Sequence, residues 1–376
     1  MKKKICFVVS RPGTAVSFFK TPMEKLKGEF DVYLVANIAS AEEIADLPLV
    51  GYKSIKIERR LNICADVKAL WHLYNYFRQE KFYVVHSMAS KPSLLMSIAG
   101  AMACITHRIR TFTGQIWCNM HGLKRFLFKC VDRITVALNT ELLADGFPQA
   151  RYLIEQKILK PSQIKVLANG SICGIDTERF HYDEKVRGLL RKELGVEEKV
   201  VYVFLGRLKR EKGIWELFEA FNNVVTKCPK AHLLLVGEDE ERCQSWIKGF
   251  PNLKENSNIT FYGYTSRPND ILMASDVFCM PSYREGFGLS VLEASCLGLP
   301  VICSDIYGME DTFVEGVTGL RCKVQDDITL AECILKLYDQ PELREKLGKN
   351  GHDRVVRDFS RELVTNAWFD FYKELK

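Results

Sequence analysis

The sequence lacks several features that would assign it to common classes of protein. Its 376 residues contain no run of the roughly 20 apolar residues that a membrane-spanning helix needs. The thirteen cysteines are scattered singly, without a Cys-x-x-Cys pair or a Cys/His cluster at metal-ligand spacing. Neither Gly-x-Gly-x-x-Gly nor the phosphate loop ending in Gly-Lys-Ser/Thr occurs, which argues against a dinucleotide- or ATP-binding protein. Internal repeats and low-complexity tracts are also missing.

The composition that remains is that of a folded, reduced protein. With 47% hydrophobic and 27% charged residues the chain is globular rather than disordered. Its length exceeds one ordinary core and indicates two domains. The odd number of cysteines and the lack of a secretory leader favour reduced thiols in the cytosol. We therefore expect a cytoplasmic protein.

The net charge of +6 is unevenly distributed. Residues 1–165 carry 25 Lys and Arg against 13 Asp and Glu, whereas the remaining residues carry 28 against 34. A basic first half suits an anionic membrane surface or a phosphorylated substrate. Nucleic acid is the other interpretation, but no known nucleic-acid module is found, so we expect no nucleic-acid partner.

Short apolar stretches alternate with amphipathic ones along the chain. Strands are expected at 5–9, 32–35, 84–85, 109–112, 133–137, 164–167, 200–205, 232–236, 259–262, 277–280 and 301–303. This pattern predicts an α/β fold with two Rossmann-like doubly wound domains that face each other across a cleft. The expected domains are 1–168 and 169–357, followed by a C-terminal helix over 358–376 that packs back across them.

A glycine-rich bend follows the strand expected at 277–280. Gly286 and Gly288 let the backbone approach a ligand closely, and Ser290 lies where a helix would begin and present free N–H groups to an anion. Glu285 could accept hydrogen bonds from sugar hydroxyls, while Glu293 lies about two helical turns further on. The pattern suits a sugar attached to a phosphate. The alternative is a plain strand–turn–helix connection with exposed glutamates.

A basic loop follows the strand expected at 200–205. It begins at Gly206 and contains Arg207 and Lys212, which could bind a diphosphate as a planar fork and as a point charge. There they would stabilise negative charge that develops on a leaving phosphate. The alternative is a solvated surface turn.

These segments form part of an ordered series of motifs. The series is Gly206-Arg207, Lys212-Gly213, Gly263-Tyr264, Ser275-Asp276, Pro281-Ser282, Glu285-Gly286-Phe287-Gly288, Glu293-Ala294, Gly298-Leu299-Pro300-Val301 and Gly316-Val317-Thr318-Gly319. Over residues 198–325 the chain resembles the donor half of family four of the retaining GT-B glycosyltransferases.

The resemblance implies a nucleotide-diphosphate sugar as donor, with a UDP-sugar expected first and a GDP-sugar as the alternative. It implies no cofactor and no essential metal, because Arg207 and Lys212 take the charge-neutralising role. Glu285 would hold the donor sugar, Glu293 the ribose, and Tyr264 would lie by the base. The implied donor-binding residues are Gly13, Gly206, Tyr264, Gly286, Phe287, Gly288, Leu289, Ser290 and Glu293.

The first half resembles the acceptor half of these enzymes less closely. The first strand is followed by residues 11–14, where relatives often carry a glycine pair and only Gly13 remains. His86 is the first candidate for a catalytic histidine; a hydrogen-bonded structural histidine is the alternative. The acceptor-side candidates are Lys91, Thr113, Gly114 and Gln115, with Thr113 at a position where many relatives have histidine. In a retaining reaction the leaving phosphate can itself take the acceptor proton, so the departure matters less.

Together these features and the resemblance predict a retaining, metal-independent hexosyltransferase of surface polysaccharide or glycan biosynthesis, which adds a sugar to a lipid-linked saccharide at the inner face of the cell membrane. The basic run 123–129 is a possible membrane-facing element, with an ordinary packed helix as the alternative. Rival functions are a nucleotide-sugar epimerase or a phosphorylase on the same fold, and a non-catalytic sugar-nucleotide binding protein.

Overall fold

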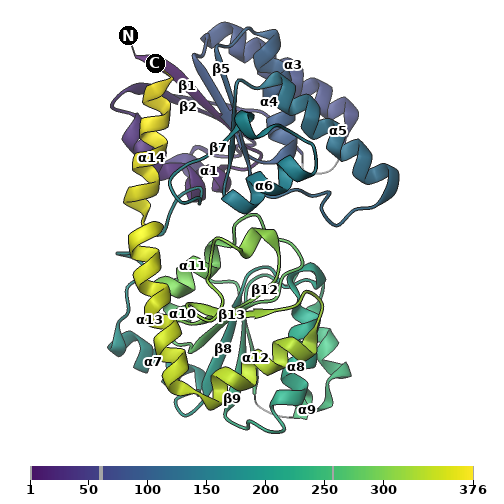
Figure 1. Ribbon diagram of the computed structural model, residues 1–376. Coiled ribbons are helices and arrows are strands. Elements are labelled where there is room, and N and C mark those ends of the chain that lie inside the picture. The colour runs from purple at the N-terminus through teal and green to yellow at the C-terminus, as the bar shows by residue number, and fades with distance from the viewer. Residues whose placement is uncertain (1, 59–61, 256–257, 376) are drawn as a thin grey trace. The chain divides into compact units, whose positions relative to one another are not determined.

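The computed structural model describes residues 2–58, 62–255 and 258–375, which form two α/β domains (Figure 1). The first domain runs up to Gly174 and includes the segment from Arg361 onward; the second is Ile175–Ser360. The first domain extends past the boundary expected at residue 168 because the following residues are bonded to it. The Ser171 N–H donates to the Asp145 carbonyl at 2.7 Å, and the Trp368 indole donates to the Ile172 carbonyl at 2.8 Å.

A seven-stranded parallel sheet forms the centre of the first domain. Its strands are β1 (Lys3–Val8), β2 (Phe30–Ala36), β3 (Gly51–Ser54), β4 (Val84–Ser87), β5 (His107–Phe112), β6 (Glu141–Ala144) and β7 (Ile164–Val166). They are arranged in the order β3-β2-β1-β4-β5-β6-β7. The central strands are almost fully buried, as parallel strands between two layers of helices should be.

Helices cover both faces of this sheet. They are α1 (Pro12–Phe18), α2 (Lys20–Leu26), α3 (Ile63–Glu80), α4 (Ser90–Met102), α5 (Gly122–Leu138), α6 (Phe147–Glu155) and α14 (Arg361–Glu374), with 3-10 turns η1 (Ala41–Ile44) and η2 (Pro161–Gln163). Trp368 and Tyr372 of α14 pack with Phe19 and Phe7 on one face, whereas α3 and α4 pack on the other. The last helix of the chain therefore completes the core of the first domain.

The second domain repeats this architecture around six parallel strands. They are β8 (Val200–Leu205), β9 (Ala231–Val236), β10 (Ile259–Gly263), β11 (Val277–Met280), β12 (Val301–Ser304) and β13 (Gly319–Cys322), in the order β10-β9-β8-β11-β12-β13. Its helices are α7 (Glu184–Leu194), α8 (Ile214–Val224), α9 (Pro251–Glu255), α10 (Pro268–Met273), α11 (Leu289–Cys296), α12 (Asp327–Asp339) and α13 (Pro341–Asp358), with 3-10 turns η3 (Arg210–Lys212), η4 (Cys243–Gly249) and η5 (Tyr307–Met309). The predicted pair of doubly wound domains is confirmed.

One predicted strand is wrong. Residues 133–137 lie in the last turns of α5, and the strand that enters the sheet is β6. The β-branched residues Ile134 and Thr135 resemble a strand in sequence. Their exposure follows a helix instead, because Asp132, Thr135 and Val136 are buried while Ile134 is half exposed.

Both sheets reverse their strand order at one place. The chain leaves β1 and β8 in one direction and returns to pair β4 and β11 on their other side. In open parallel sheets, ligands bind beyond the carboxyl ends of the strands at such a switch point. The loops after β1, β8 and β11 are therefore where a site should be sought in each domain.

Candidate functional site

The loops that follow β8 and β11 are packed directly against each other. The Tyr283 N–H donates to the Glu211 carbonyl at 2.9 Å, which ties the second loop to the first. Gly213 has φ +74°, and a Cβ there would lie 2.1 Å from the Pro281 carbonyl oxygen. Only glycine permits this approach without a shift of the backbone. The basic loop and the glycine-rich bend consequently form one surface at the carboxyl edge of the sheet.

The predicted cations of this surface are held by carboxylates. Lys212 forms an ion pair with Glu285, and both side chains are mostly buried. Arg207 lies 3.1 Å from Glu240 and is more exposed. The structure thus pairs Lys212 with Glu285 and Arg207 with Glu240, and neither ion pair was predicted from the sequence.

The glycine-rich bend opens into α11 without a side chain that caps the helix. Gly288, at φ +60°, occupies the N-cap position, where a glycine has no side chain that could bond to the first-turn amides. Leu289 and Ser290 in that first turn are half-buried, as is Glu293 one turn later. The first turn of an uncapped helix offers N–H groups and the positive end of the helix dipole to an anion. This end of α11 can therefore receive a phosphate.

The remaining donor-side candidates differ in exposure. Tyr264 follows Gly263, which has φ +83°, and is 79% exposed, so its ring is available to a ligand. Phe287 is instead buried and packs against Phe359 with ring centroids 5.9 Å apart. The Phe287 side chain therefore anchors the bend in the hydrophobic core and is not available to a ligand. Gly206 directly follows β8, and a Cβ on the nearby Gly237 would lie 1.9 Å from the Gly206 carbonyl oxygen.

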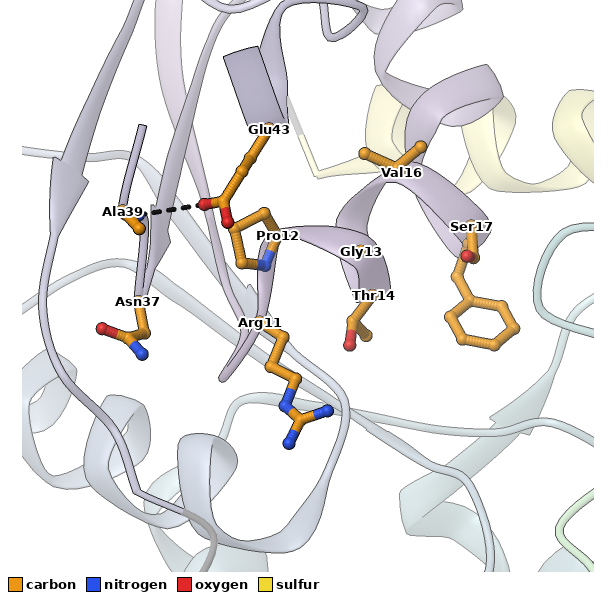
Figure 2. Close-up of a pocket in the computed structure, with 10 residues that line it drawn as sticks. Arg11, Pro12, Gly13, Thr14, Val16, Ser17, Asn37, Ala39 and Glu43 are labelled. Carbon is orange, nitrogen blue, oxygen red and sulfur yellow. Dashed lines mark hydrogen bonds between the residues drawn. The ribbon is translucent and has the colours of Figure 1, made fainter. Parts of the chain in front are cut away.

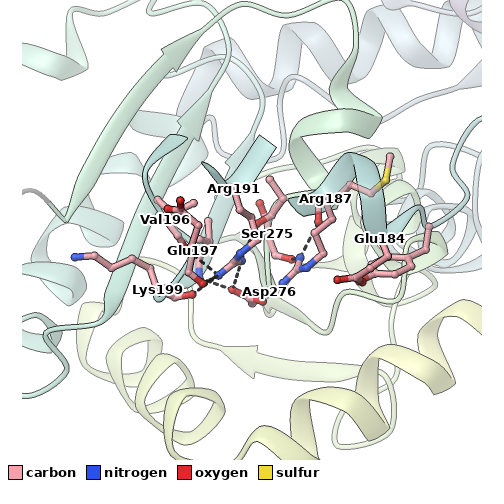
Figure 3. A network of polar contacts seen from close by, with 12 residues as sticks. Glu184, Arg187, Arg191, Val196, Glu197, Lys199, Ser275 and Asp276 are labelled. Atoms are coloured by element: carbon pink, nitrogen blue, oxygen red, sulfur yellow. Dashed lines mark hydrogen bonds and ion pairs between the residues drawn. The ribbon is translucent and has the colours of Figure 1, made fainter. Parts of the chain in front are cut away.

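The Ser275-Asp276 motif has a structural role at the opposite edge of the sheet (Figure 3). The Asp276 carboxylate accepts from Arg187 at 2.5 Å, from Arg191 at 3.0 Å and from the Val201 N–H at 2.7 Å. These contacts fasten α7 to the amino-terminal ends of β8 and β11. The motif therefore stabilises the sheet and does not contribute to the surface formed by the loops.

In the first domain the loop after β1 lines a pocket of about 870 Å³ (Figure 2). Gly13, which the resemblance assigns to donor binding, lies in its wall. Arg11, Asn37 and Glu43 contribute side chains of three different chemistries to the same pocket. The carboxylate of Glu43 accepts from the Ala39 N–H at 2.9 Å. Asn37 and Glu43 were not predicted, because nothing in the sequence marks residues beyond β2 as ligand contacts.

His86 is completely buried in the core of the first domain. Its Nδ1 bonds to the Tyr372 hydroxyl at 2.5 Å and its Nε2 to the Thr111 hydroxyl at 2.8 Å. Burial lowers the pKa of the imidazole to about 3, which keeps it neutral. Both ring nitrogens are hydrogen-bonded and the side chain has no exposed surface. His86 is therefore a hydrogen-bonded structural histidine, the alternative given above, and a substrate cannot touch it.

The acceptor-side candidates are divided between two places. Lys91 pairs with Asp66 at 2.6 Å on the α3–α4 side of the sheet. Thr113 and Gly114 are half-buried in the loop after β5, where Gly114 has φ +93°. Gln115 beside them is buried, with its amide next to that of Gln149. The structure therefore groups Thr113, Gly114 and Gln115, and places Lys91 elsewhere.

Helix α5 leaves its first half exposed. Leu123, Phe126 and Leu127 have more than half of their surface in solvent, and Arg125 and Lys129 lie on the same half of the helix. Among residues 2–58, 62–255 and 258–375, no helix has the length and apolar content to cross a membrane. In the same described residues no three His, Cys, Asp or Glu side chains gather as metal ligands would.

Comparison with known proteins identifies the second domain. Residues 186–354 match the family model of glycosyl transferases group 1. The chain carries a group 1 glycosyltransferase domain. The transferase is 29% identical over 366 residues to the capsular polysaccharide biosynthesis glycosyltransferase CapM of Staphylococcus aureus, a match that covers 97% of this chain and 95% of that protein.

A second relative is more distant. The UDP-Gal:alpha-D-GlcNAc-diphosphoundecaprenol alpha-1,3-galactosyltransferase of Escherichia coli is 25% identical over 308 residues, covering 80% of the transferase and 78% of the relative. The crystal structure of Anabaena HepE in complex with UDP and glucose superposes with a TM-score of 0.81 at 16% identity over 99% of both chains. Together with the two parallel-sheet domains, this likeness gives the transferase the GT-B fold.

One residue that shapes the surface formed by the loops after β8 and β11 was not predicted. Gly308, in η5, lies so close to the bend that a Cβ would come within 2.2 Å of the Glu285 carbonyl oxygen. In the sequence Gly308 appears only as a glycine in a loop after a core strand. Many purely structural turns contain such a glycine, so the residue type does not indicate a role at this surface.

Proposed function

We propose that the protein is a retaining, metal-independent hexosyltransferase that moves a sugar from a nucleotide-diphosphate sugar, with UDP as the first candidate nucleotide, to a lipid-linked saccharide. The observation that carries the proposal is the surface formed by the two loops of the second domain. There, Arg207 and Lys212 lie beside a glycine bend and an uncapped helix. The capsular relative supports a role in surface polysaccharide assembly, and the Escherichia coli relative supports an acceptor linked to a lipid by diphosphate.

The proposed chemistry rests on charge stabilisation. The donor diphosphate binds the amides of the first turn of α11, and the two cations stabilise the charge that grows on it as the glycosidic bond breaks. Glu285, held by Lys212, accepts hydrogen bonds from the hydroxyls of the donor sugar. The departing phosphate oxygen takes the proton of the acceptor hydroxyl, so no cofactor is required.

A membrane surface is the second part of the proposal. Helix α3 exposes Ile63, Val67 and Trp71 at a spacing of four residues, and α5 exposes Phe126 and Leu127. Both helices pack against α4, so they lie on one face of the first sheet. Apolar side chains mixed with lysine and arginine suit the boundary of an anionic leaflet. We propose that this face holds the enzyme at the inner side of the cell membrane.

The proposal is tested by incubating the purified protein with a panel of nucleotide sugars. The true donor should raise the melting temperature and, with a polyprenyl-diphosphate-linked saccharide, yield a product whose anomeric configuration by NMR equals that of the donor. The rate should be unchanged by EDTA. An inverted product would contradict the retaining mechanism, and loss of activity in EDTA would contradict metal independence.

The same experiment separates the rival functions. An epimerase would convert a nucleotide sugar into its epimer with no acceptor present, and a phosphorylase would require inorganic phosphate. A binding protein would show thermal stabilisation with no release of nucleoside diphosphate. Slow release of the diphosphate from the donor alone, accelerated by the acceptor, is the outcome that a transferase predicts.

A further inference from the structure

We propose that Tyr283 and Glu216 are positioning residues of the second domain, which hold the ion pair of Lys212 and Glu285 in the arrangement that sugar transfer requires. The inference rests on the proposed function, because it explains how the proposed donor site is kept in shape. Neither Tyr283 nor Glu216 is among the site residues that the sequence predicted.

A buried hydrogen bond joins the two residues. The Tyr283 hydroxyl donates to Oε1 of Glu216 at 2.6 Å, and Glu216 is only 5% exposed. The carboxylate belongs to the first turn of α8, where the positive end of the helix dipole favours a negative charge. Burial and the hydrogen bond to Glu216 raise the pKa of the Tyr283 phenol. The hydroxyl therefore keeps its proton and donates it to this bond.

Arg210 completes the cluster. Its Nε donates to the Tyr283 hydroxyl at 3.2 Å, and its Nη2 lies 3.6 Å from Oε1 of Glu216. Lys212, two residues further along the same loop, pairs instead with Glu285. Two neighbouring cations of one loop thus have different carboxylate partners. The cluster directs Arg210 toward α8 and leaves Glu285 to Lys212.

The backbone connects this cluster to both members of the ion pair. Tyr283 precedes Glu285 by two residues, and its N–H donates to the carbonyl of Glu211, the residue directly before Lys212. Tyr283 is therefore bonded through its main chain to one loop and through its hydroxyl to α8. A shift of this residue would move both members of the pair. Misplacement of a reacting group by about 1 Å can cost about 100-fold in rate.

The second oxygen of the carboxylate argues against a purely structural role. Within the described residues, Oε2 of Glu216 is buried and has no hydrogen-bond partner. A buried polar atom in this state lowers stability, and an apolar side chain of similar size would be less costly there. The carboxylate is better explained by the hydroxyl and the guanidinium that it holds.

The first test needs neither substrate nor turnover. Acetic anhydride labels lysine side chains, and mass spectrometry gives the labelling rate of Lys212 relative to the exposed Lys248 of the same domain. We expect Tyr283→Phe to raise the rate at Lys212 by about 2- to 10-fold, since the loss of one hydrogen bond shifts an opening equilibrium by about this factor. Glu216→Gln should change the rate in the same direction. Glu285→Gln, which weakens the ion pair itself, sets the upper limit.

The second test is turnover with the nucleotide sugar that the panel identifies. We expect kcat per folded molecule to fall by about 3- to 10-fold in Tyr283→Phe, with the KM of the acceptor unchanged. In a Lys212→Ala background the same substitution should have little further effect, because the pair is already absent. A general loss of stability would not produce this coupling.

Tyr202→Phe is the matched control. It also removes a buried tyrosine hydroxyl from the second domain, one that donates to the Ile334 carbonyl at 2.8 Å. Urea denaturation should show a loss of stability of similar size in Tyr202→Phe and Tyr283→Phe. Only Tyr283→Phe should change the labelling of Lys212 and kcat per folded molecule.

The inference is overturned if neither Tyr283→Phe nor Glu216→Gln changes the labelling of Lys212, or if Tyr202→Phe changes it equally. It is also overturned if Tyr283→Phe lowers kcat by its full factor in the Lys212→Ala background. Failure of the proposed function has a different signature. Wild type would then consume no nucleotide sugar, although the labelling of Lys212 still responded to Tyr283→Phe.

Discussion

Lys212 and Glu285 form an ion pair that joins two loops separated by 73 residues in the chain. Only 14% of the Lys212 side chain and 15% of the Glu285 side chain are accessible to solvent, so the pair is largely shielded from water. Removal of one partner leaves the other charge partly buried and uncompensated. The pair therefore organises the proposed donor site before any ligand arrives.

We expect Lys212→Ala and Glu285→Ala each to lower turnover by about 100-fold or more, the scale seen when a charge-stabilising group is lost. The double variant should lose much less than the product of the two effects, because the residues act as a unit. Steady-state kinetics with a fixed acceptor measures this. Lys248→Ala, at an exposed position of the same domain, is the control. Wild-type rates in a folded Arg207→Ala, Lys212→Ala double variant would end the proposal.

For the pair of Arg207 and Glu240 we expect that removal of the carboxylate charge improves donor binding. Because Glu240 contacts Nη1 of the Arg207 guanidinium at 3.1 Å, its carboxylate competes with a donor diphosphate for this cation. Exposed ion pairs contribute about 0.2–1 kcal/mol, so Glu240→Gln should tighten donor binding by up to about 5-fold. Donor affinity is measured by titration of the nucleoside diphosphate. Weaker binding in Glu240→Gln would show that the carboxylate contacts the donor itself.

Two glycines provide a matched pair of substitutions. Gly308→Ala would drive a Cβ to 2.2 Å from the Glu285 carbonyl oxygen, whereas Gly188→Ala in α7 has nothing within 4 Å. We expect Gly308→Ala to destabilise the protein by about 1–3 kcal/mol and to reduce donor binding, since the bend must move. Gly188→Ala should stabilise it by about 0.5–1 kcal/mol. Urea denaturation checks both, and equal stabilities would mean that the bend tolerates the added methyl group.

The fold could be predicted because its signals are local. Buried parallel strands show as short apolar runs that end at turn residues, and ten of those expected were placed correctly. The failures have physical causes. The strand expected at 133–137 is helical because β-branched residues lie on an amphipathic helix, and β3 was missed because its four residues are mostly exposed at the edge of the sheet.

The site was only partly accessible to sequence analysis. Arg207, Lys212 and Glu285 could be selected because charged residues and glycines follow two strands. The pairing of Arg207 with Glu240, and the close approach of Gly308 to the bend, depend on contacts between loops that are distant in the chain. The residue type also does not reveal whether a side chain is buried. His86 has suitable chemistry for a base, but four aromatic side chains surround it and two hydroxyls bond to its ring.

The exposed half of α5 makes the membrane proposal testable. Phe126→Glu and Leu127→Glu should each reduce sedimentation with phosphatidylglycerol vesicles by about 10-fold, because an apolar contact is replaced by a charge that the leaflet repels. Leu189→Glu alters a similarly exposed leucine on α7 of the second domain and should have no effect. Binding of wild type to neutral phosphatidylcholine vesicles should be weak. Equal sedimentation of all variants would remove this face of the first domain as the contact.

The buried imidazole of His86 predicts a specific dependence of stability on pH. Its pKa is lowered to about 3 in the folded protein, whereas an unfolded histidine titrates near 6.5. Between these values the unfolded chain binds a proton that the folded chain does not. The stability that the neutral ring provides is therefore complete above about pH 6.5 and is lost as the pH falls, by about 1.4 kcal/mol per unit.

His86→Gln removes this titration but keeps a side chain that can bond to Tyr372 and Thr111, the two hydroxyls that contact the ring. Between pH 6.5 and 4.5 we expect the free energy of unfolding to fall less steeply in His86→Gln than in wild type. The difference in slope should be about 1.4 kcal/mol per pH unit, which corresponds to one proton taken up on unfolding. Urea denaturation at several pH values measures the difference, in which the other titrating groups cancel. Turnover per folded molecule should be little changed, because a ring enclosed by the aromatic core touches no substrate. A loss of turnover of about 100-fold or more at unchanged stability would instead make His86 a catalytic residue and would require the core around it to open during the reaction.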